Sequence, residues 1–198
     1  MTQLRVMTLV VLSCGTMVCG ASSPEPEVLS VCAALKEIER LNGKIVTVRG
    51  VVAWVGHHGV KAMSQDGLDP YTQNCSGIGR RKRTWPPALD IRSPGDLERQ
   101  DTPAKFHEQP PTLDDLATTL REREEATGRE AAIATITGEI RTRSDIKIQR
   151  RGDDIIGNGY GQAGALPGML IVKTVIFLED PETRKPLPVR TSNSSPAK

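Results

Sequence analysis

The sequence predicts a mainly β domain with two helices, in which five strands close into a small barrel. Short segments rich in β-branched residues alternate with turn residues, and only two segments show the apolar spacing of a helix. The 198 residues also include 18 Gly and 14 Pro, which favour many turns. Aromatic residues make up 3% of the chain, so aliphatic side chains must fill the core.

Two segments are expected to be helical, and both have recognisable ends. Residues 30–41 and 113–126 carry apolar residues three or four positions apart, which forms one buried stripe on each helix. Ser30 and Thr112 are typical N-caps, because their side-chain oxygens accept hydrogen bonds from the first turn. A glycine closely follows each segment, as is usual where a helix ends in a left-handed residue.

The strands are expected where Val, Ile and Thr are concentrated between turns. Gly50 interrupts the first strand and predicts a bulge or a sharp bend. His57-His58-Gly59 is expected to form the hairpin turn into the second strand. The five predicted strands cover residues 44–55, 60–63, 88–92, 131–142 and 169–179.

The elements therefore follow one another as a helix, three strands, a second helix and two more strands. A five-stranded barrel with a helix between strands 3 and 4 is the arrangement of the OB-fold. We expect a five-stranded OB-like barrel over residues 28–180, with one helix before strand 1 and one helix between strands 3 and 4. A Pro-rich linker at residues 22–27 precedes it, and the Pro- and Ser-rich tail at residues 181–198 is predicted to be disordered.

Residues 1–21 predict a signal peptide. Arg5 gives the short positive start, residues 6–18 are uncharged and mostly apolar, and small residues such as Ala21 follow, as cleavage requires. The apolar run is shorter than the ~20 residues that a membrane-spanning helix needs, so no transmembrane span is expected in the mature chain. The sequence thus predicts a protein that is exported, either to the periplasm or out of the cell.

The four cysteines fall into two pairs. Cys14 and Cys19 lie in the signal segment, and lipid attachment at either one is the alternative to simple cleavage, although the residues before them fit a lipoprotein signal poorly. In that alternative the protein is a membrane-anchored lipoprotein. Cys32 and Cys75 belong to the mature domain, where an oxidising compartment favours a disulfide between them over two separate buried thiols.

Two segments resemble parts of small exported bacterial proteins of uncharacterised function. In VCAALKEIERLNGKIVTVRGVV a cysteine-bearing helix leads into the pattern G-K-x-V-x-V-R-G, and in GYGQAGALPGMLIVKTV a Gly-Tyr-Gly loop precedes the last strand. The similarity covers roughly residues 28–76 and 157–178. It implies an OB-like barrel in which Cys32 pairs with a loop cysteine such as Cys75, and it supplies no catalytic residues.

A basic run followed by a tryptophan is the sharpest charged feature of the chain. Phosphate groups attract such a run, and a nearby aromatic ring can stack on a base or a sugar. We assign weak ligand-binding roles to this group and to two further aromatic residues, one of them in the Gly-rich loop. The candidate residues are Trp54, Arg80, Arg81, Lys82, Arg83, Trp85 and Tyr160. For the basic run, a solvated loop without a ligand is the alternative.

Other motifs carry little weight. Residues 159–164 match G-x-G-x-x-G but lead into a strand rather than a helix, so they do not predict a dinucleotide site. The histidines, His57, His58 and His107, lack metal-ligand spacing, so neither a metal nor another cofactor is expected. A net charge of +2 and the few aromatic residues argue against nucleic acid as the partner.

The sequence therefore favours a non-catalytic binding module that acts outside the cytoplasm on a glycan, an anionic polymer or an envelope protein. One alternative is a structural envelope component that acts through protein–protein contacts. A second alternative is a hydrolase that uses loop carboxylates such as Asp66, Asp69, Asp153 and Asp154. No residue is assigned a catalytic role.

Overall fold

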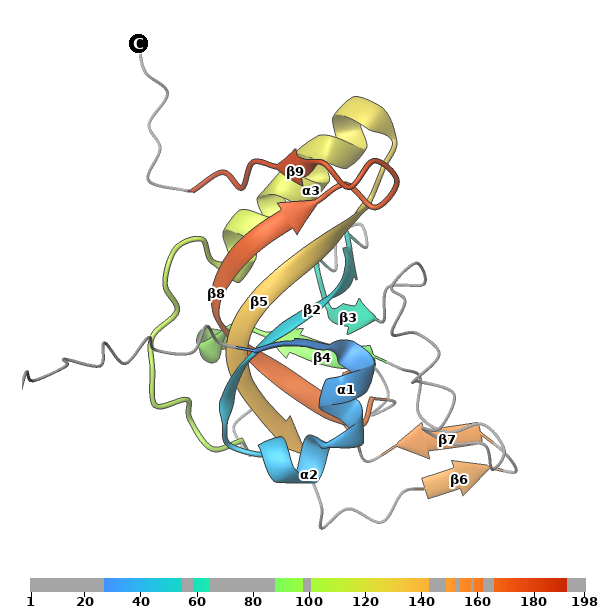
Figure 1. Ribbon diagram of the computed structural model, residues 1–198. Helices are drawn as coiled ribbons and strands as arrows, with labels where there is room; N and C mark the ends of the chain where they lie inside the picture. The colour runs from blue at the N-terminus through green and yellow to red at the C-terminus, as the bar shows by residue number, and fades with distance from the viewer. Residues whose placement is uncertain are drawn as a thin grey trace, which may run out of the picture.

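The computed structural model describes residues 27–54, 59–64, 88–97, 101–142, 149–151, 154–157, 159–161 and 166–191. Along the chain the elements are β1 (Val28–Ser30), α1 (Val31–Lys36), α2 (Ile38–Leu41), β2 (Ile45–Ala53), β3 (Ala62–Ser64), β4 (Ala88–Arg92), the 3-10 turn η3 (Pro94–Asp96), α3 (Leu113–Thr127), β5 (Ala131–Thr142), β6 (Gln149–Arg151), β7 (Asp154–Gly157), β8 (Gly168–Glu179) and β9 (Pro186–Leu187). In Figure 1, β2, β5 and β8 are long curved strands, and β3 and β4 are short.

Five of the strands close into a barrel. β2 pairs with β3, β3 with β4, and β5 with both β2 and β8, all antiparallel, while β4 and β8 run parallel. The circuit β2–β3–β4–β8–β5–β2 is the order of an OB-like barrel, and α3 lies in the chain between its third and fourth strands. The predicted fold class is confirmed. β6 and β7 pair only with each other, in the connection between β5 and β8.

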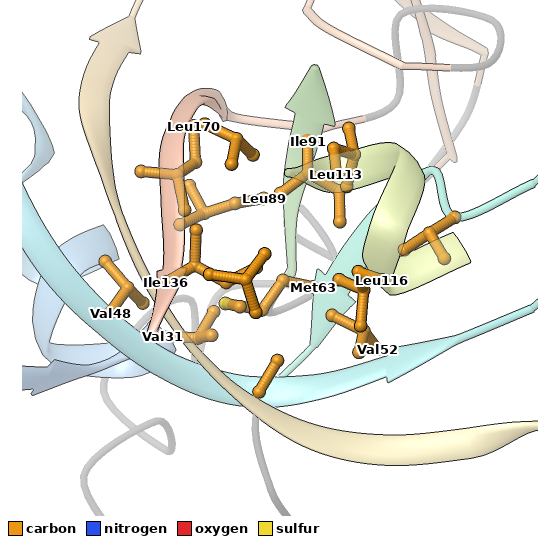
Figure 2. Close-up of a cluster of buried hydrophobic side chains, with 14 of the residues drawn as sticks. Val31, Val48, Val52, Met63, Leu89, Ile91, Leu113, Leu116, Ile136 and Leu170 are labelled. Atoms are coloured by element: carbon orange, nitrogen blue, oxygen red, sulfur yellow. The ribbon is translucent and has the colours of Figure 1, made fainter. Parts of the chain in front are cut away.

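Aliphatic side chains fill the barrel, as the composition predicts. Figure 2 shows Leu89 and Ile91 of β4 in one cluster with Met63 of β3 and Leu116 of α3. All four side chains are buried. Burying a side chain of this size stabilises the fold by about 1.5–3 kcal/mol, so the barrel interior is the main source of stability.

α3 begins and ends where the sequence predicts. The Thr112 side chain accepts a hydrogen bond from the Asp115 backbone N–H, and the Asp115 carboxylate accepts one from the Thr112 backbone N–H, which completes a capping box. Gly128 ends the helix in the left-handed conformation, with φ of 69°. The helix packs on β8 through its buried leucine stripe.

The predicted first helix is divided into two short helices, and a strand precedes it. α1 and α2 meet at Glu37, and they pack on different strands: α1 on β2 and β4, and α2 on β5. β1 pairs parallel with residues 47–49 of β2, ahead of the part of β2 that pairs with β3. It thereby covers an edge that would otherwise be open.

Gly50 serves a close approach rather than the predicted bulge. The pairing of β2 with β5 is continuous from Ile45 to Ala53, so no extra residue is inserted at Gly50. A Cβ atom at Gly50 would lie 2.6 Å from the Ser64 carbonyl oxygen and 2.6 Å from Val31 Cγ2. The irregularities of register fall between β5 and β8 instead.

The Pro-rich segment between η3 and α3 crosses the outside of the barrel. The Gln109 N–H donates to the Lys173 carbonyl at 2.7 Å, and the Val175 N–H donates to the Pro111 carbonyl at 2.8 Å, so this segment lines the edge of β8. Beneath it lies a second small core on the outer face of the sheet. Its residues are Leu97, Ala104, Phe106, Tyr160, Leu166, Met169 and Ile171.

The predicted disorder of residues 181–198 is wrong for residues 181–191. Asp180 begins a turn, and β9 then pairs with the end of β8. Val189 packs against the main core, and Arg190 forms an ion pair with Glu122 of α3 at 3.1 Å. The end of the described chain therefore belongs to the folded domain, while residues 192–198 lie outside the described part.

Candidate functional site

In OB barrels the outer face of strands 2 and 3 with the adjoining loops forms the ligand surface. Here those strands are β3 and β4, which pair between Ala62 and Ser64 on one side and Ala88 and Asp90 on the other. The residues that define this surface, which we call the β3–β4 face, are Lys61, Ala62, Ser64, Asp90, Arg92 and loop residues 159–161.

Two charged residues of β4 lie on the β3–β4 face. Leu89 and Ile91 belong to the core, so the alternation of the strand turns Asp90 and Arg92 outward. The Arg92 Nε donates to Asp90 Oδ2 at 2.8 Å. The Asp90 side chain is 2% exposed and that of Arg92 is 24% exposed. The pair thus joins a carboxylate that is shielded from water to a guanidinium at the surface.

A short stretch of the Gly-rich loop shields Asp90. Gly161 lies against the carboxylate: a Cβ atom there would be 3.4 Å from Asp90 Oδ1 and 2.9 Å from Leu166 Cδ1. Gly161 also has φ of 71°, a conformation that a side chain would strain. Tyr160 and Leu166 exchange two backbone hydrogen bonds of 2.9 and 3.0 Å, which fix the loop at this point. The left-handed backbone conformation therefore favours glycine at position 161.

Burial raises the pKa of Asp90 above its ordinary value of 3.8, because a carboxylate removed from water loses hydration. The hydrogen bond and the charge of Arg92 act in the opposite direction, as do the backbone N–H of Gly161 and the charge of Lys61. With Asp90 ionised, Asp90, Arg92 and Lys61 together carry a net charge of +1. Protonation of Asp90 raises the net charge of these three groups by one.

The next strands continue this outer face with a second arginine–carboxylate pair. Arg141 of β5 donates to Glu139 Oε1 at 2.9 Å, and both side chains are largely buried. Arg141 also donates to the carbonyl oxygens of Thr102 and Pro103 in the crossing segment. Because its donors are engaged with backbone and with Glu139, we assign Arg141 to holding this segment on the barrel.

The two predicted aromatic residues that the structure describes do not form an exposed platform. Tyr160 is 7% exposed and packs against Met169 and Ile171, so its prediction as an aromatic presented by the loop is wrong. The loop folds down onto the sheet, which buries the ring. Trp54 follows β2 directly, is half-buried and packs against the main core. Its backbone N–H donates to the Glu130 carbonyl at 2.9 Å.

The remaining predicted site residues lie outside the described part of the chain. They are Arg80, Arg81, Lys82, Arg83, Trp85 and the cysteine Cys75. Cys32 is described and is fully buried in α1. The disulfide between Cys32 and Cys75 therefore stays a prediction.

The residues of the hydrolase alternative are also mostly outside the described part. Asp66, Asp69 and Asp153 lie there, and Asp154 is the first residue of β7.

Within the described ranges, no group of three or more His, Cys, Asp or Glu side chains could hold a metal ion. No helix in those ranges is long and apolar enough to cross a membrane.

Sequence reasoning did not single out Asp90 and Arg92, although a signal for them exists. The strand from Ala88 to Arg92 was predictable, and its alternation turns the two charged residues to the side opposite Leu89 and Ile91. Nothing local indicates that Gly161 covers Asp90, because that contact joins distant parts of the chain.

No family model, no curated protein and no solved structure matches this chain.

Proposed function

We propose that this chain is an exported, non-catalytic binding module that holds an anionic polymer at the β3–β4 face. One observation carries the proposal: the β3–β4 face carries cations, and the stretch of sequence between β3 and β4 contains four more. Lys61 and Arg92 lie at that face, and residues 80–83, a run of four cations, belong to the segment that joins β3 to β4. Clustered cations attract a polyanion and increase its rate of association.

The described aromatic residues favour an anionic ligand over a neutral glycan. Stacking on a sugar or a base needs an exposed ring. Tyr160 is buried in the small outer core, and Trp54 packs against the main core. Charge is therefore the recognition chemistry that the described part of the β3–β4 face supports.

Inorganic polyphosphate is expected to raise the thermal midpoint of the purified full chain. A ligand at about 100 times its dissociation constant adds ~2.7 kcal/mol of stability, which shows as a clear shift. The shift should shrink as salt is added, because charge drives the binding. A polyuronate, single-stranded DNA and a neutral oligosaccharide complete the panel, and the neutral sugar should give no shift. The two acidic polymers distinguish a phosphate ligand from a carboxylate ligand.

A charge-matched pair of variants locates the binding surface. Replacing Arg80, Arg81, Lys82 and Arg83 by Gln should abolish the shift. The control replaces four exposed lysines on other elements by Gln; these are Lys36, Lys44, Lys105 and Lys185. Equal loss in both variants would show binding by net charge alone and would refute a site at the β3–β4 face. Silence of the wild-type chain across the panel would instead point to a protein partner.

Export and the disulfide can be tested by mass. We propose cleavage near Ala21 and a bond between Cys32 and Cys75; Cys32 is fully buried and its sulfur is not a free thiol. The intact mass of protein from the periplasm of a bacterial host should correspond to a chain without its first 21 residues, and reduction should add two hydrogens. Reduction should also lower stability by about 2–4 kcal/mol. The mass of a longer chain that begins at Cys19 or Cys14 and carries a diacylglycerol group on that cysteine would establish the lipoprotein alternative.

A further inference from the structure

We infer that Asp90 is a built-in counter-anion: its negative charge lies against the Arg92 guanidinium and opposes an anionic ligand at the β3–β4 face, so protonation of Asp90 strengthens binding. This inference rests on the proposed function and adds regulation by pH to the same face.

The geometry of the pair supports competition. Asp90 Oδ2 lies 2.8 Å from Arg92 Nε, which is the distance of a charge-assisted hydrogen bond. Arg92 remains 24% exposed, so a ligand can approach it, whereas Asp90 is 2% exposed and cannot turn away into water. A polyanion at Arg92 would therefore meet the fixed negative charge of Asp90 directly behind the guanidinium.

The surroundings of Asp90 make its charge adjustable. The groups around it are Arg92 on its own strand, Lys61 ahead of β3, the uncharged Met169 on β8 and the backbone N–H of Gly161 in the loop. Burial raises the pKa of Asp90, so it takes up a proton at a higher pH than an exposed aspartate does. Mild acid thus increases the positive charge of the face by one while Arg92 and Lys61 stay charged.

Asp90→Asn removes the negative charge of the side chain but keeps its size and shape. An asparagine can present its carbonyl oxygen to the Gly161 N–H while it removes the negative charge beside Arg92. Glu125→Gln on α3 is the matched control, because it removes one exposed negative charge from another surface. Dissociation constants for polyphosphate would be measured at fixed ionic strength from about pH 7 down to about pH 4.

At about pH 7, Asp90→Asn is expected to bind polyphosphate about fivefold more tightly than the wild-type chain, which is what one surface ion pair adds. Its affinity should also change less on acidification, because the group that titrates has been removed. Glu125→Gln should follow the wild-type curve. Equal affinities and equal pH profiles for Asp90→Asn and Glu125→Gln would overturn the inference.

A second variant tests the same inference if Asp90→Asn fails to fold. Arg92→Gln should bind more weakly, and its gain on acidification should be smaller than that of the wild-type chain. A gain in Arg92→Gln as large as that of the wild-type chain overturns the inference. If the wild-type chain binds polyphosphate but these variants behave as the control does, only the counter-anion role fails. If no variant binds at any pH, the proposed function fails and the inference fails with it.

Discussion

Replacing Gly138 by Ala is expected to destabilise the barrel by about 3 kcal/mol, the upper end of what overpacking costs. A Cβ atom at Gly138 would collide with the Ile171 carbonyl oxygen and would lie 3.0 Å from Leu170 Cδ1. The first of these atoms is part of the β8 backbone, so it cannot rotate away as a side chain could. Relief requires β5 and β8 to separate at this point of their pairing.

Urea unfolding would measure this loss as a lower midpoint with an unchanged slope. Gly95→Ala in η3 is the control, because the nearest atom to its Cβ would be Ser93 Oγ at 3.8 Å. It should change stability by no more than about 0.5 kcal/mol. A Gly138→Ala variant as stable as the control would mean that β5 and β8 do not approach as closely as described.

Asp180→Asn is expected to lower the thermal midpoint of unfolding near neutral pH. The midpoint of this variant should also decrease less than that of wild type when the pH is lowered. Asp180 accepts backbone hydrogen bonds from Glu182 at 3.0 Å and Thr183 at 2.8 Å, and it forms ion pairs with Arg123 and Arg129. These contacts connect α3 and the residue after its C-cap to the turn between β8 and β9.

The hydrogen bonds from Thr183 hold the pKa of Asp180 well below its usual range, despite its burial, and those from Glu182 and Arg123 add to this. A carboxylate whose folded-state pKa is depressed stabilises the fold above the unfolded-state value and loses that contribution as pH falls towards the folded-state value. The contribution should therefore be complete above about pH 5 and should decline below it. Equal midpoints for wild type and Asp180→Asn near neutral pH would contradict this role.

Thermal unfolding across pH, for wild type and Asp180→Asn, would show two curves that converge as the solution becomes acidic. Asp96→Asn provides the control, because Asp96 is an exposed aspartate of η3. Its curve should run parallel to that of wild type. If the control converges in the same way, net charge rather than the Asp180 contacts would explain the result.

The sequence by itself determined the elements whose signals are local. Thr112, the leucine stripe and Gly128 define α3 within a few turns of chain, and the β-branched runs define β2, β5 and β8. Because a five-stranded barrel with one helix between its third and fourth strands has few alternatives, the order of these elements was enough to predict the fold class.

Only the tertiary structure decided features that join distant segments. The division of the first helix at Glu37 follows from packing on two different strands, and the order of the tail follows from the pairing of β9 with β8. Tyr160 is buried and Asp90 is shielded because the loop folds onto β4 and β8, where β4 and β8 lie side by side. Local composition does not indicate such contacts, because each contact depends on which apolar surface a distant part of the chain buries.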